Sequence, residues 1–496
     1  MDRCYTVALA AMLLLSQSAF AAIQMPQEGA TTEMGAHPVG FRSVVVFDHS
    51  RRYQPERYTT DSATPVRARP VQISLWYPAA DSTGFERLQV GDYRLLTRLD
   101  RALGAWPADE REQFLDSLLT VLVERGYTEA QARAVLAQRV RARAGAPMKV
   151  GVHPLVVYGP SMIASVRGNT VLFEYLASHG YIVAAHPSFG VTARMMDTGW
   201  MGLESQVRDM AFTLGYLRQE LGDSIDSVAL MGHSWGGLAA VVAAMDDPTI
   251  AALISLDSSV EQWRDLVVAA PGYDPIKLRV PFLHVETSAN VRHGFYESVE
   301  FADRYRLSFP TLGHFDVVSS RYQPRGSVKD TLYAMNNRFI RAFLDAYLKK
   351  ETHGLEELVA WIDLRGGDTI KVAHAKGHRP PPTEAELVQM YLSQRSDEAE
   401  RAVADAKALV SEAYTEATLL RVGELILWSW RHFPEAEEAL HFAAMLYPAS
   451  PRVHEMLGNL YWGLGNEEQA RANFEKALDL DPSNKRVQAN LDFLRK

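Results

Sequence analysis

One short segment constrains this chain more than any other: a glycine-rich turn that separates an apolar strand from an apolar helix. Residues 227–231 are typical of a buried strand, Gly232-His-Ser-Trp-Gly236 forms the turn, and residues 238–245 are typical of a packed helix. In that context a G-x-S-x-G pattern indicates a nucleophile elbow, a sharp turn that presents the serine hydroxyl at the end of a sheet. The sequence therefore predicts Ser234 as a nucleophile; the alternative is a glycine-rich turn that only packs.

Length, charge and one apolar run narrow the class of protein. At 496 residues the chain is long enough for more than one globular domain. Its net charge of −9 comes without a basic block, which argues against a nucleic-acid partner. The apolar residues 7–15 precede an Ala19-Phe-Ala21 cleavage pattern, so we expect residues 1–21 to be a signal peptide. The mature chain would then be secreted or periplasmic, without a transmembrane segment; an uncleaved anchor is the alternative.

Apolar strands alternate with amphipathic helices between residues 41 and 349. This order predicts an α/β fold with a mostly parallel sheet covered by helices on both faces. An active site in such a sheet lies beyond the carboxyl ends of the strands. Residues 51–70, rich in Arg, Pro and Thr, are expected to form a connecting loop. The predicted strands are 41–47, 71–77, 154–158, 181–185, 227–231, 252–256, 281–285 and 305–309, and the main predicted helices are 169–178, 203–221, 238–245 and 330–349.

Residues 86–148 interrupt this alternation with a helical pattern. Leucines at 115, 118, 119 and 122 share one helix face, and Thr128 is placed to cap a second helix. The insertion is either a lid or wall of an acyl pocket, or an excursion that covers one edge of the sheet. The sequence leaves both interpretations open.

A serine nucleophile needs a base to take its proton. His314 lies in a glycine turn directly after the strand at 305–309, and we predict that it is this base. Its rivals are His293, which follows the strand at 281–285, and His284, which lies inside that strand. His284 is expected to be a core histidine.

The base in turn needs a carboxylate that orients its ring. Asp257 follows the strand at 252–256 directly, and we predict that it is the acid. Glu286, after the next strand, is the rival position. Asp316, two residues beyond His314, is expected to cap its turn.

Six segments together resemble the platelet-activating-factor acetylhydrolase and dienelactone-hydrolase-like group. They are Gly232-His-Ser-Trp-Gly236, Leu256-Asp257, Gly313-His-Phe315, Ile73-Ser-Leu-Trp-Tyr-Pro78, Pro154-Leu-Val-Val-Tyr158 and Leu176-Ala-Ser-His-Gly-Tyr181. The resemblance covers roughly residues 40–350 and implies an α/β-hydrolase fold. In the acetylhydrolase branch the acid takes the position of Asp257; the dienelactone branch proper has a cysteine where this chain has Ser234.

The resemblance also implies an oxyanion hole made by two backbone N–H groups. One would come from Trp235, directly after the nucleophile, where the first N–H groups of a helix are free. The other would come from Met162, in the loop after the strand at 154–158. That loop usually has a glycine where this chain has Ser161, and Pro160 has no N–H to offer.

A few other residues are candidates for the walls of a pocket. His186 ends the strand at 181–185 and either lines the pocket or packs in the core. Trp200 and the pair Met195-Met196 lie on the following loop, where packing is the simpler interpretation. No histidine–carboxylate spacing indicates a metal, and the sequence suggests no cofactor.

The chemistry ends near residue 350, and the rest of the chain follows a helical repeat pattern. Residues 351–382 are expected to be a connector and residues 383–496 a repeat domain. Its best unit, residues 451–484, matches a tetratricopeptide repeat at Leu457-Gly458, Tyr461, Ala470, Phe474, Ala477 and Pro482. Weaker units precede it, and residues 486–494 look like a cap helix. The repeats either bind a protein partner or a second copy, or pack against the hydrolase domain.

These observations predict a secreted serine hydrolase that cleaves carboxylic esters, with short-chain or lipid-like acyl groups as candidates. Ser234, His314 and Asp257 would form its triad. Peptide or amide hydrolysis uses the same triad logic and remains an alternative. A non-catalytic scaffold that acts through its repeats is the alternative from another class.

Overall fold

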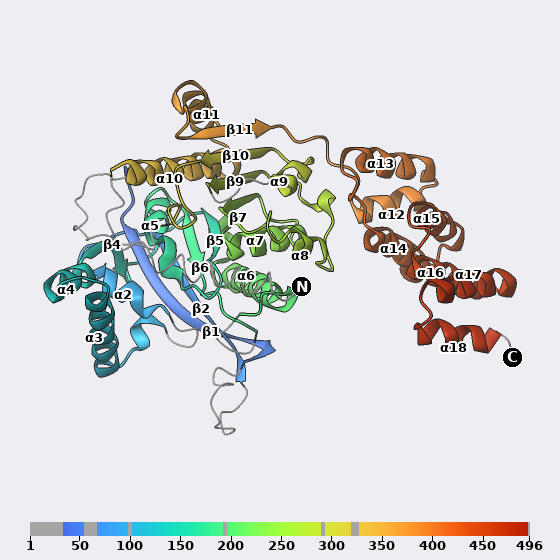
Figure 1. Cartoon of the computed structure of the whole chain (residues 1–496), viewed down its shortest axis with the longest axis horizontal. Helices are drawn as coiled ribbons and strands as arrows, with labels where there is room; N and C mark the ends of the chain where they lie inside the picture. The colour runs from blue at the N-terminus through green and yellow to red at the C-terminus, as the bar shows by residue number, and fades with distance from the viewer. Residues whose placement is uncertain are drawn as a thin grey trace.

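A mixed sheet organises residues 39–375 (Figure 1). The computed structural model describes residues 33–53, 67–97, 102–191, 196–288, 293–318 and 327–494, so the predicted signal peptide lies outside the described residues. Within them the strand order is β11-β10-β9-β8-β7-β5-β6-β2-β1-β4-β3. The run from β6 to β10 is parallel, which confirms the predicted α/β architecture. The strands are β1 Val39–Tyr53, β2 Arg67–Pro78, β3 Arg87–Gln89, β4 Arg139–Ala144, β5 His153–Gly159, β6 Ile182–Ala185, β7 Ile225–His233, β8 Ala252–Leu256, β9 Phe282–Thr287, β10 Arg304–Phe309 and β11 Lys371–Ala375.

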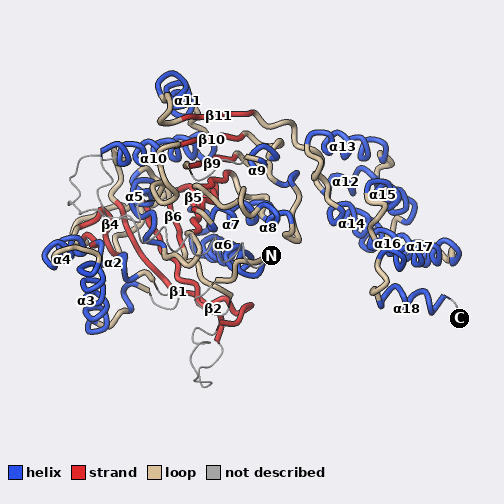
Figure 2. Tube along the Cα trace, in the orientation of Figure 1, coloured by secondary structure: helices blue, strands red, loops and turns tan. Residues whose placement is uncertain are grey.

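Helices cover both faces of this sheet (Figure 2). Successive side chains of β5 point to opposite faces of the sheet, and both faces are apolar. Val156 and Tyr158 pack into one apolar layer, while Leu155 and Val157 pack into the other. The first layer is closed by α5 Thr170–Ser178 and α10 Ser327–Leu348, and the second by α6 Trp200–Leu221 and α7 Trp235–Asp246.

The prediction of a loop over residues 51–70 is wrong at both ends. β1 continues to Tyr53, and β2 begins at Arg67. Arg51 and Arg69 made this stretch resemble a solvated loop, but both side chains are buried and form ion pairs with Asp209 on α6. A charge that is paired inside the protein cannot be distinguished from a solvated one by composition alone.

The insertion at residues 86–148 is only partly helical. Its helices are α2 Val90–Leu95, α3 Ala108–Glu124 and α4 Glu129–Ala137, and they are flanked by β3 and β4. β4 pairs with β1 and β3 pairs with β4, so the insertion extends the edge of the sheet farthest from β11. This position favours the edge-covering interpretation over a lid.

The segment expected to be a connector carries two further elements. α11 (His353–Arg365) packs against α10, and β11 pairs antiparallel with β10 from Arg304↔Ala375 to Ser308↔Lys371. The sheet therefore continues 25 residues past the predicted boundary at residue 350, from 351 to 375. The five-residue β11 is short and partly exposed, which is why its sequence pattern is weak.

The C-terminal lobe consists of paired helices (Figure 1). They are α12 Glu384–Leu392, α13 Ser396–Leu409, α14 Glu416–Glu424 with its π-helical extension Leu425–Trp430, α15 Phe433–Leu446, α16 Pro451–Gly463, α17 Glu467–Leu480 and the last helix α18 Lys485–Leu494. Within the best repeat, Gly458 lies directly under the Phe474 ring, and a Cβ on Gly458 would lie 2.5 Å from that ring. Across the described chain, no helix combines the length and apolarity needed to span a bilayer.

One buried carboxylate makes several contacts between the two lobes. Asp274, in the turn before the short helix η4 (Pro275–Lys277), is fully buried. It accepts hydrogen bonds from the backbone N–H groups of Tyr414 and Thr415, each at 3.1 Å, and from Thr418 Oγ1 at 2.5 Å. Asp274 therefore caps the N-terminus of α14 from the other lobe, where a negative charge is favourable.

Neighbouring contacts extend this interface. Arg264 Nη2 lies 2.7 and 2.6 Å from the two carboxylate oxygens of Glu412, and Tyr273 donates to the same carboxylate at 3.1 Å. Ile276 and Phe301 of the α/β lobe are buried within the apolar core of the repeats. The repeat lobe thus packs against the α/β lobe, in line with the packing interpretation of the sequence.

We expect Asp274→Ala to destabilise the docked repeat lobe by about 3 kcal/mol, because three donors of α14 and its cap would lose a buried charged acceptor. Urea unfolding followed by circular dichroism, with limited proteolysis of residues 376–383, measures this change. Asp265→Ala, which removes an exposed carboxylate from the nearby helix α8 (Arg264–Val268), is the control. Equal unfolding midpoints for the two variants would contradict the role of Asp274.

Candidate active site

Ser234 lies on the sharp turn between β7 and α7. Its backbone has φ 55° and ψ −122°, a strained conformation for a residue with a side chain, and the residue is 7% exposed. The turn is possible because glycines allow its neighbours to approach: a Cβ on Gly236 would lie 2.0 Å from the carbonyl oxygen of Gly159, and one on Gly232 would lie 2.1 Å from that of Gly236. This geometry is that of a nucleophile elbow.

Asp257 and His314 meet beside this turn. His314 Nδ1 donates to Asp257 Oδ2 at 2.6 Å. Asp257 also accepts from the N–H and hydroxyl of Thr287, both at 2.9 Å. Burial alone would raise the pKa of Asp257, but the His314 and Thr287 hydrogen bonds bring it below its usual range. The carboxylate is therefore held ionised and fixed, as an orienting acid requires.

The hydroxyl of Ser234 is not hydrogen-bonded to His314 among the described residues. Its polar neighbour is Ser259, with the two Oγ atoms 3.4 Å apart. Because Asp257 occupies Nδ1, the Nε2 atom of His314 is the nitrogen left for a serine proton. The pair in contact is thus the predicted acid and the predicted base. For the predicted chemistry, the contact between Ser234 and His314 would have to tighten when substrate binds.

The two predicted oxyanion donors are the backbone N–H groups of Trp235 and Met162. Within the described chain, neither Trp235 N, at the start of α7, nor Met162 N, in the loop after β5, donates to a backbone carbonyl. Two hydrogen bonds to its carbonyl oxygens fix the loop after β5. Gln206 Nε2 donates to the carbonyl oxygen of Pro160 at 2.8 Å, and Ser188 N donates to that of Ala164 at 2.8 Å. The role of the Trp235 and Met162 N–H groups as oxyanion donors stays a prediction.

The serine that replaces the expected glycine in this loop has a definite partner. Ser161 Oγ lies 2.6 Å from Nδ1 of His233, and His233 Nε2 lies 2.9 Å from the carbonyl oxygen of His314. Sequence reasoning missed His233, which occupies the variable position of the G-x-S-x-G pattern. The departure from glycine at Ser161 was the one signal that could have pointed to it.

The rival acid and the rival base pair with each other instead. Glu286 Oε2 lies 3.2 Å from His293 Nδ1, although the angle is too poor for a hydrogen bond. Glu286 also accepts from Ser308, and burial raises its pKa. His284 is fully buried and contacts Ser255 Oγ at 3.1 Å, as expected of a core histidine. None of these three side chains contacts Asp257 or His314 within hydrogen-bond distance in the part of the chain described.

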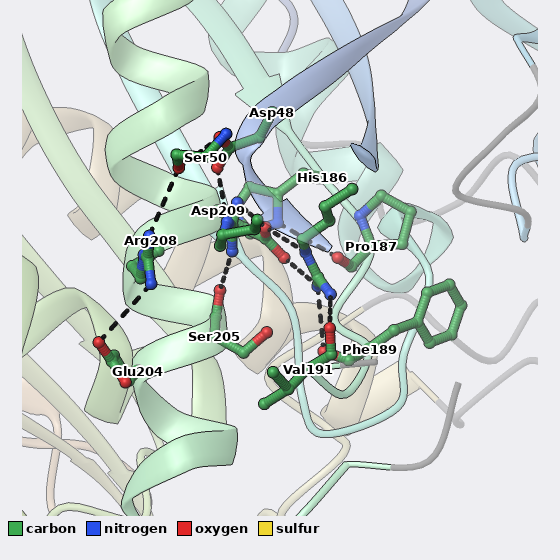
Figure 3. A network of polar contacts seen from close by, with 12 residues as sticks. Asp48, Ser50, His186, Pro187, Phe189, Val191, Glu204, Ser205, Arg208 and Asp209 are labelled. Carbon is green, nitrogen blue, oxygen red and sulfur yellow. Dashed lines mark hydrogen bonds and ion pairs between the residues drawn. The ribbon is translucent and has the colours of Figure 1, made fainter. Parts of the chain in front are cut away.

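A buried ion network lies behind the loop that follows β6 (Figure 3). Arg69 and Arg51 both bind Asp209, with closest N–O distances of 2.6 and 2.7 Å. Burial would raise the pKa of Asp209, but the two guanidinium groups hold it below its usual range. Arg69 also donates to three successive carbonyl oxygens of the loop, those of Phe189, Gly190 and Val191. The network fixes the course of this loop beside Ser188.

The remaining candidates are packing residues. His186 is fully buried, donates from Nδ1 to the carbonyl oxygen of Pro187 at 3.2 Å, and has a pKa lowered by burial. Met196 is buried in the apolar layer under α6, and Trp200, the first residue of α6, packs against the same layer. Met195 lies outside the described residues. Among the residues described, no three His, Cys, Asp or Glu side chains are grouped to hold a metal ion.

Comparisons with known proteins match two segments of this chain. Residues 130–262 match the chlorophyllase family model, and residues 451–484 match a tetratricopeptide repeat model. The first segment includes Met162, Ser234 and Asp257 but ends before His314. Chlorophyllase type 0 of Chenopodium album is 27% identical over 129 residues, which span 36% of that relative's length.

A solved structure is similar over a longer range. The ferulic acid esterase from Streptomyces cinnamoneus aligns with 67% of this chain and 94% of its own, at 20% identity and a TM-score of 0.45. The acetylhydrolase and dienelactone-hydrolase branches of the expected resemblance stay predictions. The chain thus combines an α/β fold that contains a chlorophyllase-like segment with a C-terminal segment that matches a tetratricopeptide repeat.

Proposed function

We propose that this protein is a serine hydrolase that cleaves carboxylic esters through an acyl-enzyme. The observation that carries the proposal is the strained elbow of Ser234 beside the Asp257–His314 pair, whose Nδ1–Oδ2 distance is 2.6 Å. A structural glycine turn has no need of a serine with positive φ next to a half-buried imidazole that a buried carboxylate orients. The match of residues 130–262 to the chlorophyllase model supports the same class of chemistry.

Each residue has one role in the proposed reaction. Ser234 Oγ attacks the acyl carbon while His314 Nε2 takes its proton, and the N–H groups of Trp235 and Met162 bind the oxyanion. His314 then returns the proton to the leaving alcohol, and the acyl group remains as an ester of Ser234. Water, deprotonated by His314, attacks this ester and releases the acid and free Ser234. Asp257 keeps Nδ1 protonated throughout.

The surroundings of these residues favour an apolar ester. Ile163, next to the proposed donor Met162, packs with the buried rings of Tyr53 and Phe189. Phe315, next to His314, is 43% exposed, and Met201, on the first turn of α6, is 61% exposed. Exposed apolar side chains beside catalytic loops are typical of sites for apolar ligands. A short-chain or lipid-like acyl ester therefore fits better than a charged one.

The repeats are proposed to add a protein-binding surface, either for a partner or for a second copy of the chain. The match of residues 451–484 supports a repeat of the type used in such contacts. Their first helices contact the hydrolase lobe, so a bound protein would be held next to the enzyme domain.

Ser234→Ala should abolish hydrolysis of p-nitrophenyl acetate and butyrate, because the acyl-enzyme can no longer form. Ser227→Ala, which removes an exposed serine hydroxyl from the start of the same strand, should keep the parent rate. Initial rates over both substrates measure the difference. If parent and Ser234→Ala are equally inert on these esters but cleave p-nitroanilide substrates differently, the amide alternative replaces the ester proposal.

Asp257→Asn should lower kcat by about 10⁴-fold, because the amide no longer stabilises the tautomer with a proton on Nδ1 of His314. Glu286→Gln is the matched variant on the next strand and should change kcat less than threefold, roughly the scatter expected for a neutral substitution. The ratio of kcat values for the two variants tests the assignment. A larger loss in Glu286→Gln than in Asp257→Asn would reverse it.

A further inference from the structure

His233 contacts two loops: the loop that carries the proposed oxyanion donor Met162, and the loop that carries the proposed base His314. Its Nε2 lies 2.9 Å from the carbonyl oxygen of His314, and its Nδ1 lies 2.6 Å from Ser161 Oγ. A carbonyl oxygen only accepts hydrogen bonds, so Nε2 carries the proton. In a neutral imidazole Nδ1 is then an acceptor, and the Ser161 hydroxyl donates to it.

The ring is in a setting that keeps it neutral. His233 is 2% exposed, and its ring lies 4.7 Å from the ring of His314, with the two planes tilted by 31°. Burial and the neighbouring His314 lower the pKa of His233 to about 3. At neutral pH the ring therefore has one donor and one acceptor, and each is matched by one partner.

The two partners position groups with different roles. Ser161 directly precedes Met162, the proposed second oxyanion donor, while the carbonyl of His314 belongs to the proposed base. His233 itself directly precedes Ser234. One imidazole thus joins the loop of the oxyanion donor, the nucleophile elbow and the loop of the base.

We propose that Ser161 and His233 are positioning residues that act as a unit: the neutral His233 ring couples the placement of the oxyanion loop to the placement of His314. This inference rests on the proposed function. The link depends on a hydroxyl at position 161, which a glycine there would lack. Loss of that hydroxyl would leave the buried Nδ1 of His233 without its donor and allow the ring to turn or change tautomer.

The first test measures kcat and KM for p-nitrophenyl butyrate in three variants. Ser161→Ala should lower kcat about tenfold with KM unchanged, because the groups it misplaces act in the transition state. Ser161→Thr, which keeps the hydroxyl, should recover most of the loss. Ser178→Ala is the matched control, since it removes another buried serine hydroxyl, one that donates to the carbonyl oxygen of Tyr175 at 2.7 Å. It should lower stability without changing kcat.

A double-mutant cycle tests whether the two residues act as a unit. His233→Phe keeps a ring of similar shape without either hydrogen bond. The kcat loss of Ser161→Ala/His233→Phe should be no larger than that of His233→Phe alone. Losses that multiply, or a Ser161→Ala enzyme with kcat within twofold of the parent, would overturn the proposal.

A measurement that needs no activity separates this inference from the proposed function. The ¹⁵N spectrum of histidine-labelled protein, assigned by the missing signal in His233→Phe, should show His233 as the neutral Nε2–H tautomer, with an Nδ1 signal that shifts in Ser161→Ala. If the parent is inert toward every ester, the proposed function fails, and this spectrum still decides the coupling. An Nδ1–H tautomer, or a signal unchanged in Ser161→Ala, would overturn the coupling even in an active enzyme.

Discussion

The site depends on how closely two turns of the sheet approach each other. The carbonyl oxygen of Gly159, at the end of β5, leaves no room for a Cβ on Gly236, because the two atoms would be only 2.0 Å apart. Position 236, in the first turn of α7, therefore requires a glycine. The turn before it has the strained backbone conformation of Ser234. This approach brings the loop of Met162 next to the start of α7. The same contact therefore lies beside the turn of Ser234 and beside the loop of Met162, the predicted second oxyanion donor.

The acid is tied to the elbow through the strand ends. Ser234 N donates to the carbonyl oxygen of Leu256, and Asp257 N donates to that of Val285. The next residues then lead toward the repeats: the Trp263 ring packs edge-on against that of Trp235 at 5.7 Å, and Arg264 binds Glu412. One continuous segment, residues 257–279, carries the predicted acid, packs against Trp235, the predicted oxyanion donor, and contacts the repeat lobe through Asp274. A protein bound to the repeats would act next to the chemistry rather than far from it.

Local patterns were sufficient for the fold and for much of the site. Alternating apolar strands and amphipathic helices predicted the α/β sheet because burial on both faces imposes that order. The rule that polar residues at strand carboxyl ends converge predicted Asp257 and His314 as neighbours, and they are in direct contact. Their catalytic roles stay predictions.

What the sequence could not indicate are features set by pairing between distant segments. Arg51 and Arg69 resembled loop residues, since nothing local reveals Asp209 as their partner. β11 has a weak pattern because it is a short edge strand, and nothing local reveals that Asp274 accepts hydrogen bonds from α14 and its cap, about 140 residues away. The contact between Ser161 and His233, 72 residues apart, belongs to the same class.

The central claim is that Ser234 is the nucleophile, and the most direct measurement is the site of covalent labelling. The full chain, treated with a fluorophosphonate probe and digested, should give one modified peptide, with the adduct on Ser234. The neighbouring Ser259, with its Oγ 3.4 Å away, provides a demanding internal comparison because it shares the same surroundings. An adduct on Ser259 or on another serine, or no adduct on a chain that unfolds cooperatively, would contradict the account.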